Sequence, residues 1–317
     1  HGRLVIDGGQ TGTRLRTQTS DGMVGEPIEA GPIHTDRPVV AQIAEYARAV
    51  LTSASTAASS ITQVAAGVSG LTPQWSRPGD LLTALSDLGV DSVALAHDSV
   101  SAYLAANHAA FGATIAVGTG VVSLGVGDAG TARVDGWGYL FGDAGSAFWI
   151  GRAGLDAALR AFDGRGPATT LRDRATEVFG PLPELYMTLQ GNADRVALTA
   201  GFARIVDECA VAGDRVAAGI NDAAADQLAL SVSTALQRSG WTSGAPGRVS
   251  WMGTVLARNE RIRDRFVTLV TASAPGVRVE PPLGTALDGV SLLLDLPADH
   301  PLAADIHRAT TVDSPTR

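Results

Sequence analysis

Lysine is absent from this 317-residue chain, and all of its 24 basic side chains other than histidine are arginines. The absence excludes a catalytic lysine and, with it, a Walker-type phosphate loop. Cysteine occurs once, as Cys209, which excludes an internal disulfide and any zinc or iron–sulfur site built from several cysteines of one chain. This usage is typical of a reducing compartment, and we expect a cytoplasmic protein.

Long hydrophobic runs and basic clusters are also missing. No apolar stretch reaches the length of a membrane span, and the N-terminus lacks the features of a signal peptide. The formal net charge of -8 argues against nucleic acid as a partner. We therefore expect a globular protein that binds neither membrane nor nucleic acid, with a length typical of about two domains.

Two glycine–threonine turns stand out among the residues that are present. Each follows an apolar run that predicts a strand, and each is followed by a second strand-like run. Glycine lets backbone amides approach an anion closely, and threonine hydroxyls add donors. The pair predicts two phosphate-binding hairpins, formed by Gly8, Gly9, Gln10, Thr11 and Thr13 in the first and by Gly118, Thr119 and Gly120 in the second. Taken singly, each is also compatible with an ordinary tight turn.

The order of expected elements indicates an α/β protein in two parts. Apolar periodicity predicts strands at 4–7, 15–19, 25–30, 63–68, 92–96, 113–117, 121–126, 248–252 and 277–280, and helices at 39–51, 77–88, 100–110, 216–236 and 285–296. The strand–turn–strand pattern restarts near residue 110. We expect a small N-terminal domain at 1–110 and a larger domain with a helical insert at 111–317, with the option that the last helix returns to the first domain.

Two aspartates follow expected strands directly. Asp7 ends the first strand, where a carboxylate is well placed to hold magnesium, although aspartate also caps turns. Asp98 follows the strand at 92–96, at the strand end where α/β folds bind ligands, and is our candidate general base. A plain helix N-cap is the alternative for Asp98. We expect the neighbouring His97 to point elsewhere and to be structural.

A glycine-rich segment from Asp135 to Arg152 is typical of a loop that closes over a polar ligand. Within it, Asp143 is a candidate for binding sugar hydroxyls, whereas Trp137 and Trp149 favour packing over ligand stacking. Farther along, the turn at Gly253 and Thr254 follows a strand and is a candidate to approach adenosine. By itself that turn is also compatible with a simple strand-to-helix connection.

These motifs together resemble the N-acetylglucosamine kinases of the BadF/BadG ATPase group, in the superfamily of sugar kinases, Hsp70 and actin. The most specific part is the stretch with Gly136-Trp137-Gly138, Gly142-Asp143-Ala144-Gly145-Ser146 and Trp149-Ile150-Gly151-Arg152; the segment Ala200 to Arg204 is a second, less specific match. The resemblance implies two ribonuclease H-like domains of the actin and hexokinase type, each a mixed five-stranded sheet with helices, flanking a central cleft. It also implies ATP and Mg²⁺ as cofactors, and relatives are often dimers, which leaves a homodimer open.

The resemblance implies a role for each matched position. Asp7 lies near magnesium, the two hairpins hold phosphates, and Asp98 deprotonates the sugar hydroxyl. The sugar-binding loop corresponds to Gly136, Trp137, Gly138 and Asp143, and the adenine-nucleotide pocket to Ala200 and Gly253. Two positions depart from the family pattern: Ala144 replaces a glutamate, and His34 stands where a sugar-contacting asparagine is expected.

The leading hypothesis is an ATP-dependent kinase that phosphorylates the 6-hydroxyl of an amino sugar, N-acetylglucosamine or glucosamine. An ATPase that activates CoA-ester dehydratases is a second hypothesis, which the single cysteine disfavours. A non-catalytic sugar sensor is a third, disfavoured because Asp98 is present and because the first hairpin starts at residue 7.

Overall fold

The computed structural model describes residues 1–9, 12–34, 36–53, 61–71 and 74–311 and divides the chain into two compact units. Unit 1 is formed by His1–Ala110 together with Pro281–Arg317, and unit 2 by Phe111–Glu280. The chain thus leaves unit 1 once and returns to it. The second unit therefore ends at Glu280 rather than at residue 317, and the last helix returns to unit 1, in agreement with the option stated for it.

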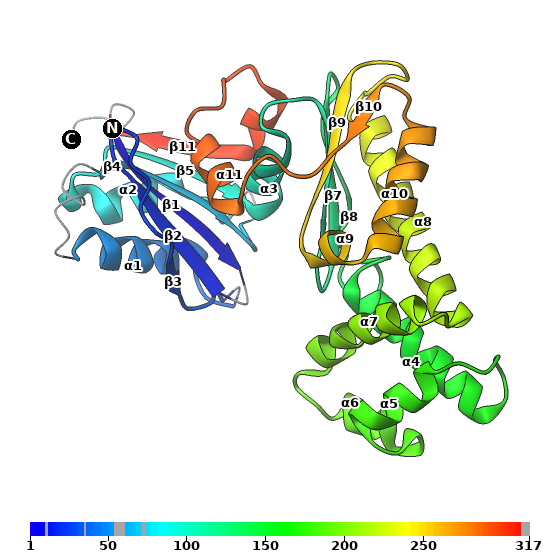
Figure 1. Cartoon of the computed structure of the whole chain (residues 1–317). Coiled ribbons are helices and arrows are strands. Elements are labelled where there is room, and N and C mark those ends of the chain that lie inside the picture. Colours follow the sequence, from blue (N-terminus) through cyan, green and yellow to red (C-terminus); the bar gives the residue numbers. More distant parts are fainter. Residues whose placement is uncertain (10–11, 35, 54–60, 72–73, 312–317) are drawn as a thin grey trace. The chain divides into compact units, whose positions relative to one another are not determined.

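Unit 1 is built on a six-stranded mixed sheet in the order β11-β5-β4-β1-β2-β3 (Figure 1). Its strands are β1 (Gly2–Gly9), β2 (Gly12–Gln18), β3 (Ile28–Ala30), β4 (Ile61–Val68), β5 (Ser92–His97) and β11 (Ile306–Thr310). Strands β1, β4 and β5 are parallel, whereas β2, β3 and β11 join by antiparallel pairs. An α/β fold with a mixed sheet is confirmed, and the sixth strand adds to the expected five.

The sixth strand also corrects the sequence-based view of the C-terminus. The polar composition of residues 309–317 predicts a frayed tail, but Ala309 pairs with Val93 and Thr310 with Ser92. Ile306 is buried and the strand forms the edge of the sheet beside β5. A five-residue strand with one buried apolar residue gives little periodicity to detect.

Four α-helices cover the sheet of unit 1: α1 (Val39–Leu51), α2 (Pro78–Leu85), α3 (Asp98–Asn107) and α11 (Ala286–Leu292). The core joins apolar side chains of the strands to one face of α1 and of α2. Helix α11 packs on α3 and β1, and it begins with a capping box between Thr285 and Asp288.

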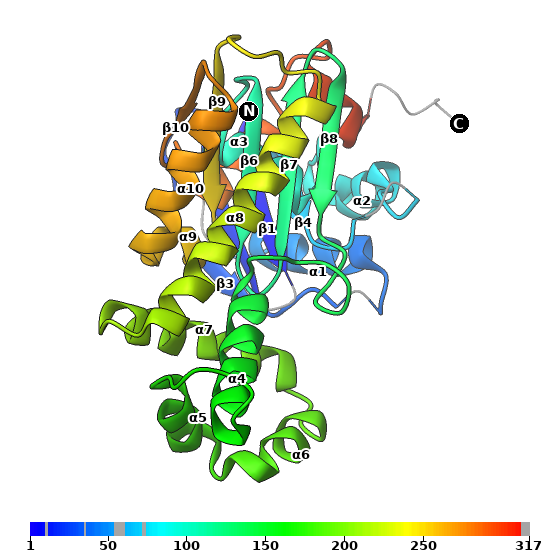
Figure 2. The same cartoon turned by 90° about the vertical axis from the view of Figure 1, so that its right-hand side faces the viewer.

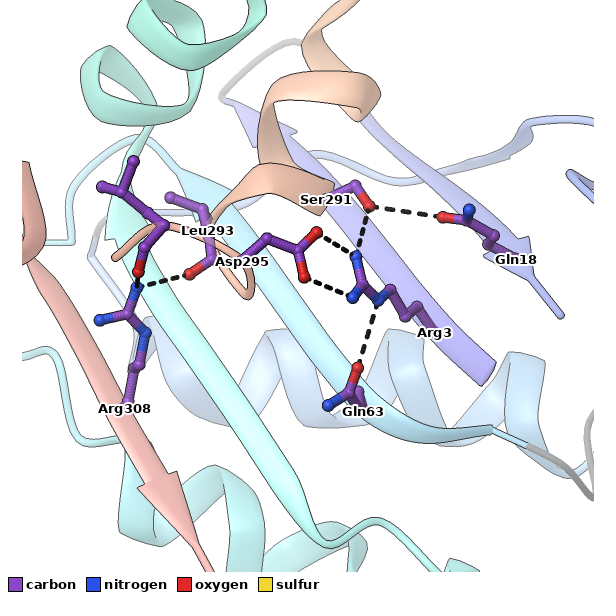
Figure 3. A network of polar contacts seen from close by, with 8 residues as sticks. Arg3, Gln18, Gln63, Ser291, Leu293, Asp295 and Arg308 are labelled. Carbon is purple, nitrogen blue, oxygen red and sulfur yellow. Dashed lines mark hydrogen bonds and ion pairs between the residues drawn. The ribbon is translucent and has the colours of Figure 1, made fainter. Parts of the chain in front are cut away.

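A polar network fastens the returning segment to the first strand (Figure 3). Both terminal nitrogens of Arg3 donate to the carboxylate of Asp295, at 2.6 Å each, and its Nε donates to Gln63 at 3.2 Å. Arg308 donates to the main-chain carbonyls of Leu293 and Leu296. A bidentate arginine–carboxylate pair fixes geometry as well as charge, so the C-terminal segment is an integral part of unit 1.

Unit 2 has a five-stranded sheet in the order β10-β9-β6-β7-β8. The strands are β6 (Gly112–Val117), β7 (Val121–Gly127), β8 (Gly130–Asp135), β9 (Gly247–Met252) and β10 (Val277–Val279). An antiparallel meander of three strands is extended by two parallel strands beside its first member, as β3-β2-β1-β4-β5 is in unit 1. The repeat expected from the sequence is therefore a repeat of topology.

The helices of unit 2 fall into two groups, those on the sheet and those beyond it (Figure 2). Their bounds are α4 (Ala147–Asp163), α5 (Leu171–Phe179), α6 (Leu185–Gln190), α7 (Arg195–Val211), α8 (Arg215–Arg238), α9 (Thr254–Arg258) and α10 (Glu260–Ser273). Helix α8 packs on β6, β7 and β8 and against α10, and α4 packs against α7. None of the helices in the described residues is both long and apolar enough to cross a bilayer.

Candidate functional site

The first hairpin joins β1 to β2 in unit 1, and the register separates its side chains by face. Asp7 pairs with Arg14, and Gly8 pairs with Thr13, so Thr13 lies on the opposite face of the strands from Asp7. The Thr13 side chain is in the core, at 1% exposure, and its hydroxyl has no hydrogen-bond partner among the residues that the structure describes. Gln10 and Thr11, also expected to bind phosphate, lie outside the described residues.

Asp98 begins α3 directly after β5, and two neighbouring side chains hold its carboxylate. Ser69 Oγ donates to Oδ2 at 2.5 Å, and His97 Nδ1 lies 2.8 Å from Oδ1. The expectation that His97 points away from Asp98 was therefore wrong. Alternation along a strand predicts the side-chain direction only within the strand. His97 is the last residue of β5 and also the N-cap of α3, and its ring contacts Asp98 and the Ser99 N–H.

The electrostatics of Asp7 and Asp98 differ, although both belong to unit 1. Burial and the negative charge of Asp98 raise the pKa of Asp7 to about 6, and Arg14 only partly offsets them. Burial acts to raise the pKa of Asp98 too, but hydrogen bonds from His97, Ser69 and the Ser99 backbone and the charge of His97 outweigh it and lower the pKa. Carboxylate oxygens of this kind are ligands that fit a hard divalent cation such as Mg²⁺.

His34 lies in the loop that follows β3, beside the first hairpin. Ile33 donates its N–H to the Gly9 carbonyl at 2.9 Å, and Gln42 accepts from the His34 N–H and donates to the His34 carbonyl, both at 2.9 Å. The main chain of His34 is thus fixed while its side chain is exposed. This places the expected sugar-contacting position next to the hairpin.

The second hairpin joins β6 to β7 in unit 2 and is closed by a bond from the Gly118 N–H to the Gly120 carbonyl. The start of α4 binds its other side, because Ala147 donates to the Gly118 carbonyl at 2.9 Å and Phe148 to that of Thr119 at 3.3 Å. A Cβ added to Gly118 would meet no atom within 4 Å. The backbone at Gly118 is therefore open to close approach by a ligand.

The glycine-rich loop is anchored by Asp135, which the sequence analysis did not single out. Its carboxylate accepts from the backbone N–H groups of Asp143, at 2.8 Å, and Ala144, at 3.1 Å. Asp135 and Asp143 both have positive φ angles, of 61° and 57°, which are uncommon outside glycine. This strain marks a loop whose shape is held by tertiary contacts.

Asp143 itself lies at the base of this loop, at 7% exposure. Burial and the charge of Asp135 raise its pKa, although the backbone of Val121 and of Gly138 donates to it. A Cβ on Gly120 would approach Asp143 Oδ2 to 2.8 Å, so the carboxylate adjoins the second hairpin.

The tryptophans of this segment differ in their surroundings. Trp149 packs partly buried against the core of unit 2, as expected. Trp137 is instead 75% exposed, and Phe141, four residues later in the same loop, is 90% exposed. The positive φ angles at Gly136 and Gly138 carry Trp137 outward, and the residue type alone did not reveal this.

A cavity of about 270 Å³ lies between α4, α7 and α9 in unit 2. It is lined by Ile150, Ala200, Gly201, Ala203, Arg204, Asp207, Thr254, Val255, Arg258 and Asn259. Gly253 leads into it with φ at 92°, and any Cβ there would overlap the Val117 carbonyl, one residue before the second hairpin. The cavity thus joins the expected nucleotide positions Ala200 and Thr254, and Gly253, the residue before Thr254, packs against Val117, the residue before Gly118.

The expected site residues therefore form one group in each unit. Unit 1 brings together Asp7, Gly8, Gly9, His34 and Asp98. Unit 2 brings together Gly118–Gly120, the loop 136–143, Ala200 and Gly253–Thr254. Sequence reasoning missed Ser69, Asp135, Asp207 and Asn259. Ser69 follows β4 by one residue, as Asp98 follows β5, so its strand-end position was the available signal.

Known proteins resemble the chain in sequence and in fold. An N-acetylmuramic acid/N-acetylglucosamine kinase of Clostridium acetobutylicum is 26% identical over 251 residues, which are 74% of this chain and 79% of that protein. A candidate N-acetylglucosamine kinase from Chromobacterium violaceum superposes with a TM-score of 0.71 at 24% identity, over 92% of this chain and 98% of that chain. Another, from Porphyromonas gingivalis, gives 0.67 at 19% identity, over 91% and 97%.

At these identities the structural likeness shows a shared fold, the sugar-kinase type of two mixed α/β sheets. The sequence profile of one family extends over residues 4–290, from the first strand of unit 1 to the returning helix α11. The chain therefore belongs to the BadF/BadG/BcrA/BcrD ATPase family.

Proposed function

We propose that this protein is an ATP-dependent sugar kinase that transfers the γ-phosphoryl group to the 6-hydroxyl of an amino sugar, N-acetylglucosamine or glucosamine. The observation that carries the proposal is the Asp98 carboxylate, held by Ser69 and His97 at the carboxyl end of β5. A member of an ATPase family that also orients an ionised carboxylate has the group needed to activate an alcohol.

The choice of sugar is supported by similarity. The Clostridium acetobutylicum relative is a kinase of N-acetylmuramic acid and N-acetylglucosamine, so N-acetylmuramic acid joins the candidates. The imidazole of His34 and the methyl of Ala144 would alter the contacts to the sugar. Because ATP is a cytoplasmic metabolite, we expect the protein to act in the cytoplasm.

ATP binding would fall to the residues of unit 2. The cavity at Ala200 and Thr254 suits the nucleoside, and the unobstructed space at Gly118 leaves room for a phosphate beside the second hairpin. In unit 1, the desolvated Asp7 would hold Mg²⁺, which neutralises phosphate charge when it is bound.

Asp98 would act as the base. Its lowered pKa keeps it ionised near neutral pH, and it would accept the proton of the sugar hydroxyl as that oxygen bonds to the γ-phosphorus and the bond to ADP breaks. Phosphoryl transfer depends mainly on positioning and charge stabilisation, so a base held by two side chains suits this reaction.

The activator ATPase hypothesis gains no support. Cys209, the single cysteine, is buried on α7 within the core of unit 2. A cluster shared between two chains needs cysteine sulfurs at a surface. Purification without oxygen should give a colourless protein.

The test measures ADP release with glucosamine, N-acetylglucosamine, N-acetylmannosamine, N-acetylmuramic acid and glucose, and identifies the phosphorylated position of the product. D98N should lower kcat with the best sugar by about 10²–10⁴-fold, because it keeps the size of the side chain and removes the base. D87N, at an exposed aspartate paired with Arg48 in the same unit, serves as the matched control and should retain full activity.

Two results would count against the proposal. One is ATP hydrolysis that none of the five sugars stimulates. The other is a D98N variant whose sugar-dependent turnover stays within a few-fold of the unaltered protein.

A further inference from the structure

We infer that Ser69 is a positioning residue for the candidate base Asp98, a role that rests on the proposed kinase function. The inference starts from the place of Ser69 in the sheet. Strand β4 lies between β1 and β5, and its last residue, Val68, is in register with Gly8 on one side and His97 on the other. The next residue, Ser69, therefore stands between the first hairpin and Asp98.

Ser69 contacts the first hairpin through its backbone and Asp98 through its side chain. Its backbone N–H donates to the Gly8 carbonyl at 3.0 Å, and its hydroxyl donates to Asp98 Oδ2 at 2.5 Å. The hydroxyl is also the nearest group to a Cβ built on Gly9, at 3.7 Å. One residue thus links the expected phosphate hairpin to the carboxylate.

The hydroxyl bond limits how the carboxylate turns. The last side-chain torsion of aspartate is broad, so a free carboxylate samples many orientations. Ser69 on Oδ2 and His97 on Oδ1 fix the plane of the group and leave the remaining lone pairs for the acceptor alcohol. Hydrogen bonds to charged acceptors are among the stronger ones, so losing this bond should alter the geometry of proton transfer.

The backbone N–H that donates to Gly8 is kept when Ser69 is replaced by alanine, threonine or cysteine, so these variants test the hydroxyl separately from the turn. In S69A, kcat should fall by about 10- to 100-fold, while KM for sugar and for ATP should change by less than about threefold. S69T, which keeps a hydroxyl, should recover activity to within about threefold of the unaltered protein. S69C keeps the volume with a weak donor and should fall between them.

S101A is the matched control. The Ser101 hydroxyl donates at 3.0 Å to the main-chain carbonyl of Asp98 rather than to its carboxylate. S101A therefore removes a serine hydrogen bond to the same residue, Asp98, without affecting its carboxylate. Its kcat should stay within about twofold. Thermal unfolding of every variant shows whether the fold is kept; if S69A does not fold, S69T and S69C carry the comparison.

The double variant S69A/D98N distinguishes an effect that acts through the Asp98 carboxylate from a general structural effect of S69A. If Ser69 acts through the carboxylate of Asp98, S69A should cost nothing further in the D98N background. An S69A variant as active as the unaltered enzyme, or an equal loss in both backgrounds, would overturn the inference. Absence of sugar-dependent ADP release in the unaltered protein would instead refute the proposed function, and the inference with it.

Discussion

In the first hairpin, Asp7 belongs to the candidate site, whereas Thr13 belongs to the core. Asp7 and Thr13 are both near the turn, and both were expected to contact the nucleotide or its metal. The register puts them on opposite faces, so Asp7 shares its surroundings with Asp98 while Thr13 faces the core. The Thr13 hydroxyl is buried and meets no hydrogen-bond partner in the described part of the chain, an arrangement that costs folding free energy.

Replacing Thr13 by valine tests this division. T13V keeps the shape and removes the unpaired hydroxyl, so the free energy of unfolding should rise by about 1 kcal/mol, measured by urea denaturation. KM for ATP should not change. Weaker ATP binding by T13V would return Thr13 to the nucleotide site and contradict the assignment to the core.

For single residues, the sequence predicted which positions along the chain belong to the candidate site better than it predicted where their side chains point. Asp7 and Asp98 were found because each follows an apolar run, and that position is local information. The direction of a side chain depends on neighbours distant in sequence: His97 contacts Asp98 where a strand ends, and Trp137 is carried outward by two positive φ angles. Ser69 was missed because its partner lies 29 residues away.

Among the elements, the N-terminus of α8 depends on one aspartate. Asp214 accepts five hydrogen bonds: from the N–H groups of Val216 and Ala217 in α8, from the N–H and hydroxyl of Thr170, and from the hydroxyl of Thr169. It therefore caps α8 and ties it to the start of α5. Burial acts to raise the pKa of Asp214, but these hydrogen bonds outweigh it and lower the pKa to about 2.

Because the pKa of Asp214 is lower in the folded state than its unfolded value of about 3.9, Asp214 stabilises the fold at any pH above about 3.9. The contribution should be complete at neutral pH and should be lost as the pH falls from about 4 toward 2. D214N keeps the helix cap but cannot accept from the threonines. It should lower the free energy of unfolding by about 1–2 kcal/mol at pH 7, a difference that shrinks toward pH 3.

Urea denaturation at the two pH values measures the effect, with D173N, at an exposed aspartate in α5, as the control. A difference between D214N and the unaltered protein that is the same at both pH values would contradict the assignment.

Elements with strong periodicity were predicted well, and weak ones were missed. The expected helix at 39–51 matches α1, and the helix at 216–236 differs from α8 by one or two residues. Strand β8 was not expected because its sequence, Gly-Thr-Ala-Arg-Val-Asp, has only Ala132 fully buried. Such strands are specified by pairing with a neighbour, which a local pattern does not contain.

For the whole molecule, the repeated sheet topology could be predicted in outline, whereas the return of the C-terminal segment to unit 1 was only one of two options. The segment carries three features that join it to unit 1: β11 on β5, α11 on α3, and the pair of Arg3 with Asp295. Each joins residues separated by most of the chain. No periodicity in residues 281–311 reveals which sheet they complete.

This organisation makes unit 2 a continuous insertion within unit 1. Unit 2 should therefore fold as an isolated fragment, whereas unit 1 needs both of its chain segments. The fragment 111–280 contains its whole sheet, its core, the second hairpin and the cavity at Ala200. It should fold alone, with a cooperative thermal transition in circular dichroism, and should bind an ATP analogue in calorimetry.

The fragment 1–110 should not fold, because it lacks β11 and exposes the edge of β5 and one side of α3. Joining Ala110 to Pro281 by a short glycine–serine linker should restore its fold. The two ends are near each other, since Leu283 donates to the Ala106 carbonyl and Gly284 to that of Ala105. A fragment 1–110 that folds would show that unit 1 does not need β11 and α11. A fragment 111–280 that does not fold would show that unit 2 depends on unit 1.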